Sequence, residues 1–142
     1  MRITDGAKIF IKNETLNKYL FVLRDNKPNI PQPNKWSLFG GGIENGESPI
    51  EAVKRELSEE INIDVFDIEP IYSKKIVHEI QGEKNKITGY YFIGKTNTDN
   101  LSNIILNEGQ KVSFFSLEEI NQKNNVTPSI KELIKTCENK LK

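Results

Sequence analysis

Short apolar runs separated by polar turns dominate the beginning of this 142-residue chain. Residues 7–12 (AKIFIK) and 18–24 (KYLFVLR) have the length and composition of strands, and the polar residues 13–17 between them form the expected turn. The second run is apolar at nearly every position, which is typical of a central strand buried on both faces. The same pattern predicts later strands at residues 36–39, 65–80, 86–96 and 111–116.

One segment has a strong helical pattern and a well-defined start. Ser48 is a good N-cap residue, Pro49 suits the first helical position, and Glu51 completes an S-x-x-E capping box, so we expect a helix that begins at Pro49. Arg55 lies four residues from both Glu51 and Glu59 and is spaced to bridge them. Apolar residues at spacings of three and four predict one buried stripe. These residues are Ile50, Val53, Leu57 and Ile61.

Prolines mark two breaks in the pattern. Residues 26–34 (NKPNIPQPN) contain three prolines and are expected to form a loop that borders a cleft. Pro70 is expected to interrupt the strand at 65–80, because proline removes a ladder hydrogen bond. Residues 81–85 should form the turn before the next strand.

Composition and charge narrow the function classes. The chain has 20 basic and 20 acidic residues, so its formal net charge is zero, and nothing favours binding to a nucleic acid polymer or a membrane surface. Cys137 is the single cysteine, which excludes an internal disulfide and fits a reducing compartment. The first residues lack the apolar run of a signal peptide or membrane span. We expect one domain over residues 1–142, located in the cytoplasm.

Three carboxylates gather on the predicted helix. Glu56, Glu59 and Glu60 fall within one arc beside the apolar stripe, at about 100° per residue. Carboxylates on neighbouring turns repel one another, so the cluster is costly unless a cation lies among them. Mg²⁺ prefers oxygen ligands, and the glycines at 40–42 allow the backbone to approach a ligand closely. This stretch therefore predicts a metal site.

The same stretch resembles the signature of the Nudix hydrolase family, G-x5-E-x7-R-E-U-x-E-E-x-G-U, where U is an aliphatic residue. Gly41 begins the match, and Glu47 follows after five residues. Residues 55–60 (RELSEE) and 61–63 (INI) complete it. Asn62 departs from the pattern, because the family has Gly there. A left-handed residue is often required after a helix, and Asn is the next-best residue for that conformation.

The resemblance implies an α/β Nudix fold, in which a mixed β-sheet lies between helices. The signature helix would cover one side, and a helix over residues 128–140 the other. The implied reaction is hydrolysis of a phosphoanhydride bond in a nucleoside diphosphate-linked small molecule, with Mg²⁺ as cofactor or Mn²⁺ in its place. The implied metal ligands are Glu56, Glu59, Glu60 and the carbonyl oxygen of Gly40.

The resemblance leaves the proton acceptor for the attacking water open among three residues. Glu56 and Glu59 are candidates on the helix. Glu108 is the candidate in the loop before the strand at 111–116, and otherwise it is an ordinary loop residue. Glu47 and Arg55 are expected to orient the other side chains of the signature.

Three residues are expected to contact the substrate. Arg24 ends a strand and is either a phosphate clamp or a surface residue beside Asp25, with neither alternative favoured. Gly41 allows the backbone to approach the substrate. Phe39 stands where the family often has Pro, and its ring is placed to stack on a base. Aromatic residues of apolar strands more often pack in the core, and this is the interpretation we favour for Trp36.

The C-terminal part is expected to contain a short helix at 117–122 and the helix at 128–140, with Thr127 as its N-cap. In MutT-like members of the family an Asn near this point contacts the nucleobase. Asn124 and Asn125 are the candidates here, and a turn is the favoured role for both.

The resemblance favours a MutT-like nucleoside triphosphate pyrophosphatase. A nucleotide-sugar or ADP-ribose hydrolase of the same family is the alternative enzyme. A nucleotide-binding sensor without turnover is the alternative outside enzymes, although the full set of signature carboxylates argues against it. Many relatives form dimers, so a homodimer is left open.

Overall fold

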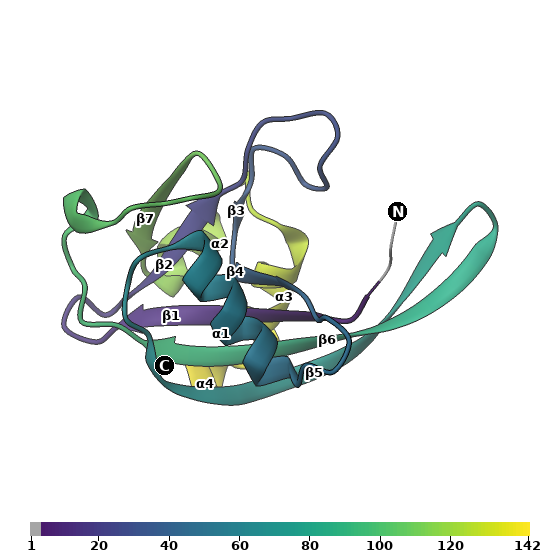
Figure 1. Cartoon of the computed structure of the whole chain (residues 1–142). Helices are drawn as coiled ribbons and strands as arrows, with labels where there is room; N and C mark the ends of the chain where they lie inside the picture. Colours follow the sequence, from purple (N-terminus) through teal and green to yellow (C-terminus); the bar gives the residue numbers. More distant parts are fainter. Residues whose placement is uncertain (1–3) are drawn as a thin grey trace.

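The computed structural model describes residues 4–142, apart from the side chains of His78 and Ile80 (Figure 1). No helix in this part of the chain is both long and apolar enough to cross a membrane. The strands are β1 (Gly6–Asn13), β2 (Lys18–Leu23), β3 (Trp36–Ser37), β4 (Phe39–Gly42), β5 (Phe66–Ile80), β6 (Glu83–Lys95) and β7 (Lys111–Phe115). The helices are α1 (Pro49–Glu60), α2 (Leu117–Gln122), α3 (Pro128–Thr136) and α4 (Glu138–Leu141), with a 3₁₀ turn η1 (Leu101–Asn103).

Strand β1 is the centre of a mixed sheet. It pairs in parallel with β6, and it pairs antiparallel with β4 through residues 6–9 and with β2 through residues 11–13. Strand β5 lies beyond β6, while β3 and β7 both pair with β2. The first and second halves of β1 thus have different antiparallel neighbours, and residues from or next to both neighbours line the cleft described below.

The sheet separates two apolar cores. Helix α1 packs on one face, and helices α2, α3 and α4 pack on the other (Figure 1). Alternate residues of β1 divide between the cores, with Ile9 and Ile11 on the α1 side and Phe10 on the opposite side. This arrangement confirms the predicted mixed sheet with the signature helix and the C-terminal helix on opposite faces.

Helix α1 begins where the sequence predicts. The Ser48 hydroxyl accepts a hydrogen bond from the Glu51 backbone N–H at 3.3 Å, and the Glu51 carboxylate accepts one from the Ser48 N–H at 2.9 Å. This is the predicted capping box. Val53 and Leu57 are buried against the sheet, so the helix has a fixed start and a fixed orientation.

Strands β5 and β6 form one long hairpin, which extends past the other strands (Figure 1). The predicted interruption at Pro70 is wrong, because β5 continues through it with a register shift between Pro70 and Tyr72 that accommodates the proline. The predicted five-residue turn is also wrong. Gln81 and Gly82 alone connect the strands, with φ of 52° and 82°, which matches the preference of tight hairpins for left-handed residues.

Two other elements are divided where the sequence predicts continuity. The strand expected at 36–39 is split at Leu38 into β3, which pairs with β2, and β4, which pairs with β1. The C-terminal helix is broken at Cys137, whose φ of −110° and ψ of 22° are not helical. Thr127 occupies the N-cap position of α3 but makes no side-chain hydrogen bond there, so its predicted capping contact is wrong.

Asn62 serves a different purpose from the one predicted. Helix α1 ends on the extended residue Ile61, and Asn62 is not left-handed. The Asn62 side chain instead accepts a hydrogen bond from the Ile105 N–H at 2.6 Å and donates one to the Asn103 carbonyl at 3.4 Å. The amide therefore ties the end of α1 to the loop that leads to β7, a role that glycine cannot fill.

Candidate active site

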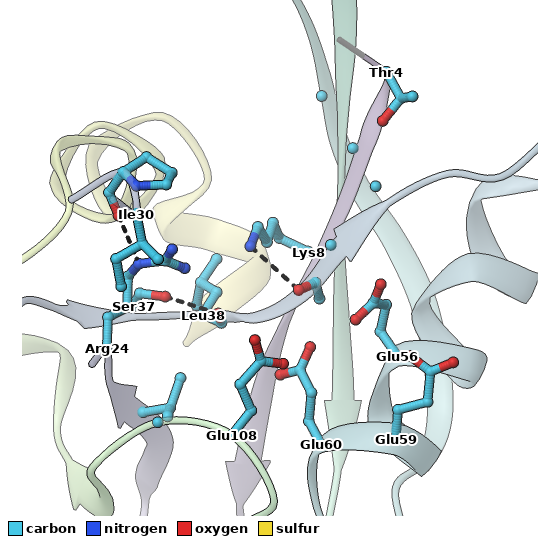
Figure 2. Close-up of a pocket in the computed structure, with 18 of the residues that line it drawn as sticks. Thr4, Lys8, Arg24, Ile30, Ser37, Leu38, Glu56, Glu59, Glu60 and Glu108 are labelled. Carbon is cyan, nitrogen blue, oxygen red and sulfur yellow. Dashed lines mark hydrogen bonds between the residues drawn. The ribbon is translucent and has the colours of Figure 1, made fainter. Parts of the chain in front are cut away.

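A cleft of about 770 Å³ opens beside the N-terminal half of β1. It is bounded by β1, β4, α1, the β5–β6 hairpin, the proline-rich loop after β2 and the loop before β7 (Figure 2). The residues that matter for its chemistry are Lys8, Arg24, Gly40, Gly41, Glu56, Glu59, Glu60 and Glu108, and its apolar lining includes Ile30, Leu38, Ile76, Ile87 and Tyr91.

Helix α1 supplies the acidic wall of the cleft. The structure brings together Glu56, Glu59 and Glu60, as the helical spacing predicts (Figure 2). Their exposure differs, because the Glu59 side chain is 58% exposed whereas that of Glu56 is 17% exposed and Glu60 is buried. Burial raises the pKa of Glu60 to about 8, and the neighbouring Glu56 adds to the shift. Glu60 is therefore the carboxylate that most needs a proton or a cation.

Arg55 holds the acidic wall together. Its guanidinium contacts Glu47 through two nitrogens, at 2.7 and 3.1 Å, and it reaches Glu56 at 3.1 Å and Glu59 at 3.3 Å. It also donates to the Gly42 carbonyl at 2.9 Å. The Arg55 hydrogen bond lowers the pKa of Glu47 from its ordinary value.

The predicted bridge from Arg55 to Glu51 is wrong. The Glu51 carboxylate is turned back onto the N-cap of α1, where it accepts the Ser48 N–H. The predicted contact between Arg55 and Glu59 is present, so Arg55 connects α1 with the loop that contains Glu47 and with strand β4.

The glycines of β4 are needed for close packing on both sides. A Cβ atom at Gly40 would lie 2.1 Å from the Ala7 carbonyl oxygen of β1, and Gly40 has a φ of 130°. A Cβ atom at Gly41 would lie 2.5 Å from the Glu56 carboxylate. Gly41 therefore leaves the space that Glu56 occupies, and both glycines line the cleft.

Lys8 is a cleft residue that we did not predict. It extends from β1 into the cleft and donates a hydrogen bond from Nζ to the Gly40 carbonyl at 3.3 Å (Figure 2). Burial lowers its pKa, while Glu60, Glu56 and Glu108 act in the opposite direction. A signal was present in the sequence, because Lys8 alternates with the apolar residues of its strand and shares a face with Phe10.

The loop after β2 forms the opposite rim. Arg24 lines the cleft, and its Nε donates to the Pro31 carbonyl at 3.0 Å. The side-chain amide of Gln110 donates to the Arg24 carbonyl at 2.8 Å and to Asn34 Oδ1 at 2.9 Å. The structure places Arg24 at the cleft, and both alternatives for its role stay predictions.

Glu108 lies in the loop before β7, and Gln110 anchors this loop to the proline-rich loop. Figure 2 shows the Glu108 carboxylate on the same side of the cleft as Glu60 and Glu56. Glu108 also contributes to the electrostatic environment of Glu60. The structure therefore brings the loop carboxylate next to the helical ones, which periodicity alone does not predict.

The prediction that Phe39 stacks on a base is wrong. Phe39 is fully buried and packs in the core beneath α1, because its side chain points to the opposite face of the sheet from the cleft. Trp36 is in the other core, as expected. Asn124 and Asn125 do not line the cleft, and the Asn125 carbonyl accepts the Trp36 N–H at 2.8 Å, which agrees with a turn role. Tyr91 is the aromatic residue that faces the cleft.

The donor set is suitable for a hard divalent cation. Carboxylates and a backbone carbonyl are the ligands that such ions prefer, and burial and Glu56 raise the pKa of the Glu60 carboxyl, a cost that a cation among these groups would offset. Within residues 4–142, no three acidic, His or Cys side chains converge closely enough to hold a metal ion as they are arranged.

Comparisons with known proteins identify the family of the chain. The sequence model of the NUDIX domain matches residues 3–137. The MutT NUDIX hydrolase of Burkholderia pseudomallei has a similar structure, with a TM-score of 0.72 at 16% identity over 95% of this chain and 98% of that one. The dihydroneopterin triphosphate pyrophosphohydrolase of E. coli gives a TM-score of 0.71 at 15% identity over 97% and 99%. A NUDIX-family hydrolase of Clostridium perfringens gives 0.70 at 17% identity over the whole of both chains.

The chain therefore belongs to the Nudix hydrolase family. It is a hydrolase of phosphoanhydride bonds in nucleoside diphosphate-linked small molecules, the reaction of this family, whose members generally use divalent cations.

Proposed function

We propose that this protein is a MutT-like pyrophosphatase that hydrolyses a nucleoside triphosphate and releases pyrophosphate in the presence of Mg²⁺. The observation that carries the proposal is the cleft itself, in which four carboxylates from α1 and the loop before β7 face Arg24 on the opposite rim. Two similar structures are named as a MutT hydrolase and a triphosphate pyrophosphohydrolase, which supports a triphosphate substrate.

The acidic residues would hold the cation. Glu56, Glu59 and Glu60, with the Gly40 carbonyl, supply oxygen ligands for Mg²⁺ or Mn²⁺. When bound, the ion neutralises phosphate charge and lowers the pKa of a bound water. Arg55 and Glu47 keep the helical carboxylates in place and do not contact the substrate in this proposal.

The remaining residues act on the substrate and the water. Arg24 presents two terminal nitrogens to phosphate oxygens, while its Nε stays on the Pro31 carbonyl. Gly41 allows a phosphate to approach the backbone of β4 closely. Glu108 accepts the proton of the attacking water from the loop, and Glu56 or Glu59 are the alternatives on the helix.

The test is product release from the purified protein across a substrate panel, with and without Mg²⁺. The panel contains ordinary and oxidised nucleoside triphosphates, ADP-ribose, nucleotide sugars and dinucleoside polyphosphates. We expect pyrophosphate from one triphosphate, and loss of this activity in Glu59→Gln and Glu60→Gln. Cleavage of a nucleotide sugar or ADP-ribose alone would replace the substrate class. Tight nucleotide binding without turnover would replace the enzyme with a sensor.

A further inference from the structure

A lysine extends into the cleft beside the carboxylates of its acidic wall. Lys8 lies opposite Gly40 of β4 and opposite Tyr91 of β6 in the sheet, so strands hold its backbone on both edges. Its neighbours on β1, Ala7 and Ile9, are fully buried on the α1 side, which directs Lys8 to the cleft side. The point from which the Lys8 side chain enters the cleft is thus set by the sheet and not by a flexible loop.

The ammonium of Lys8 has hydrogen-bonding capacity to spare. It has three N–H donors, and within residues 4–142 only the Gly40 carbonyl accepts one, at 3.3 Å. None of the carboxylates in this part of the chain forms an ion pair with it, although Glu60, Glu56 and Glu108 lie close enough to influence it. A partly buried cation with unused donors is costly unless a ligand engages it.

Arg24 is in the same situation on the opposite rim. Its Nε is occupied by the Pro31 carbonyl, and its two terminal nitrogens make no hydrogen bond within the described residues. Arg24 is also close enough to Lys8 to destabilise its charged form. Two cations that face one cleft and repel each other indicate a site for an anion with several negative charges.

We propose that Lys8 is a phosphate-binding residue that, together with Arg24 on the opposite rim, binds the polyphosphate of the substrate. The inference rests on the proposed function, because that function supplies the polyphosphate. Lys8 acts as a point charge with two free donors, and Arg24 as a fork that matches two phosphate oxygens. The acidic wall and the cationic pair then hold the phosphates between them.

A simpler role for Lys8 would be that of an internal counter-ion for Glu60. Both roles predict that removing the ammonium leaves affinity for a divalent cation unchanged or higher, because a competing positive charge is lost. They differ for an anion, because only the proposed role requires Lys8 for polyphosphate affinity. Measuring both ligands on the same variants therefore separates the two roles.

The experiment is calorimetric titration of inorganic tripolyphosphate into metal-free protein, in the presence of a chelator. Lys8→Met should bind at least about tenfold more weakly than the wild type, and Lys8→Arg should retain most of the affinity. Lys12→Met is the matched control, because Lys12 lies on the same face of β1 and carries the same charge but does not line this cleft. It should bind like the wild type.

Titration with Mn²⁺ completes the design. Lys8→Met should bind Mn²⁺ at least as tightly as the wild type, which a damaged cleft would not do. If Lys8→Met fails to fold by circular dichroism, Lys8→Gln takes its place. Equal tripolyphosphate affinity for the wild type and the folded Lys8 variant, or no binding by the wild type, would overturn the inference.

The outcomes also separate the inference from the proposed function. If the wild type hydrolyses a triphosphate while the Lys8 variant keeps its affinity and its KM, the inference fails and the function stands. If no nucleotide is hydrolysed but tripolyphosphate binding depends on Lys8, the function fails and the binding site stands. If both hold, Lys8→Met should raise KM more than it lowers kcat.

Discussion

At the scale of single residues, Arg55 and Glu60 illustrate opposite ways of handling charge. Arg55 is surrounded by acids and satisfies several at once, including a two-nitrogen contact with Glu47. Glu60 is buried beside another carboxylate, Glu56, and its raised pKa reflects that cost. Arg55 stabilises the acidic wall, whereas Glu60 leaves in it a buried carboxyl group that a cation would stabilise.

Replacing Arg55 with Lys should lower kcat/KM by about a hundredfold while the fold is retained. Lysine has a single compact ammonium and cannot contact Glu47, Glu56 and the Gly42 carbonyl together, so the carboxylates shift by a fraction of a bond length or more. Steady-state kinetics and circular dichroism are the measurements. Lys54→Gln, at an exposed position of the same helix, is the control, and full activity in Arg55→Lys would contradict the assigned role.

Replacing Glu60 with Gln should stabilise the metal-free protein in alkaline solution. Folding raises the pKa of Glu60 from 4.5 to about 8, so between these pH values the native state holds an additional proton and the free energy of unfolding falls as pH rises. Glutamine needs no proton. The melting temperature of the Glu60→Gln variant should therefore exceed that of the wild type by an amount that grows from about pH 5 to about pH 9.

The matched control for this measurement is Glu83→Gln, which changes the same charge at an exposed position of β6. Its melting temperature should follow that of the wild type across the pH range. Adding Mg²⁺ at alkaline pH should raise the melting temperature of the wild type and not that of Glu60→Gln. Parallel pH curves for Glu60→Gln and the wild type would show that burial does not perturb this carboxylate.

At the scale of elements, strand β4 and helix α1 depend on each other. Gly41 has no side chain, and Glu56 occupies the space that a side chain would need. Strand and helix are also joined through Arg55 and the Gly42 carbonyl. The glycines of the signature therefore fix the distance between strand and helix as well as allowing close approach of a ligand.

Replacing Gly41 with Ala should weaken Mn²⁺ binding by about tenfold with little loss of stability. The added methyl group would lie 2.5 Å from the Glu56 carboxylate, which is the free end of a flexible side chain and can move away. Calorimetry and thermal melting are the measurements. Gly6→Ala is the control, because its methyl group meets the Gly41 carbonyl at an ordinary 3.7 Å. Unchanged metal affinity would show that Glu56 is not a ligand.

Elements whose determinants are local could be predicted from the sequence. The start of α1 was correct because its cap, its proline and its apolar stripe all lie within a few residues. The break at Leu38 and the continuity of β5 through Pro70 could not be predicted, because each depends on which distant strand pairs with the segment. The apolar pattern of a segment does not reveal which distant strand pairs with it.

The residues of the candidate site could likewise be predicted only in part from the sequence. The acidic residues of α1 follow from helical spacing. Glu108 was a candidate from the family resemblance outside the signature, and Arg24 from its place at the end of a strand. Lys8 was missed because its surroundings are built by β4, β6 and α1, none of which is near it in sequence. Phe39 was misplaced because the face of a short strand is decided by its neighbours.

At the scale of the whole molecule, the sheet isolates one core from the other. The cleft carboxylates belong to α1 on one face, whereas α3 and α4 close the core on the opposite face. Leu141 is fully buried in that opposite core, and its carbonyl accepts a hydrogen bond from Tyr19. Stability and chemistry should therefore be separable by mutation.

Replacing Leu141 with Ala should lower the free energy of unfolding by about 2 kcal/mol, at the low end for a buried leucine, because a short terminal helix can shift into the space. Activity at a temperature well below melting should be unchanged, because Leu141 does not line the cleft. Denaturant unfolding and kinetics are the measurements. Leu101→Ala, at a 41% exposed position, is the control and should change stability by less than about 0.5 kcal/mol. Lost activity at low temperature would contradict the separation.

The central place of β1 has a consequence for biosynthesis. β1 leaves the ribosome well before its parallel partner β6, which ends only at Lys95. During synthesis the edge of β1 that pairs with β6, with its apolar residues Ile9, Phe10 and Ile11, therefore stays unpaired until β6 has been made. Unpaired apolar strands are where nascent chains aggregate or bind chaperones. Helix α1 forms from local contacts and does not wait. The cleft is complete only when Glu108 has been translated, so its carboxylates on α1 are made before the loop carboxylate that joins them.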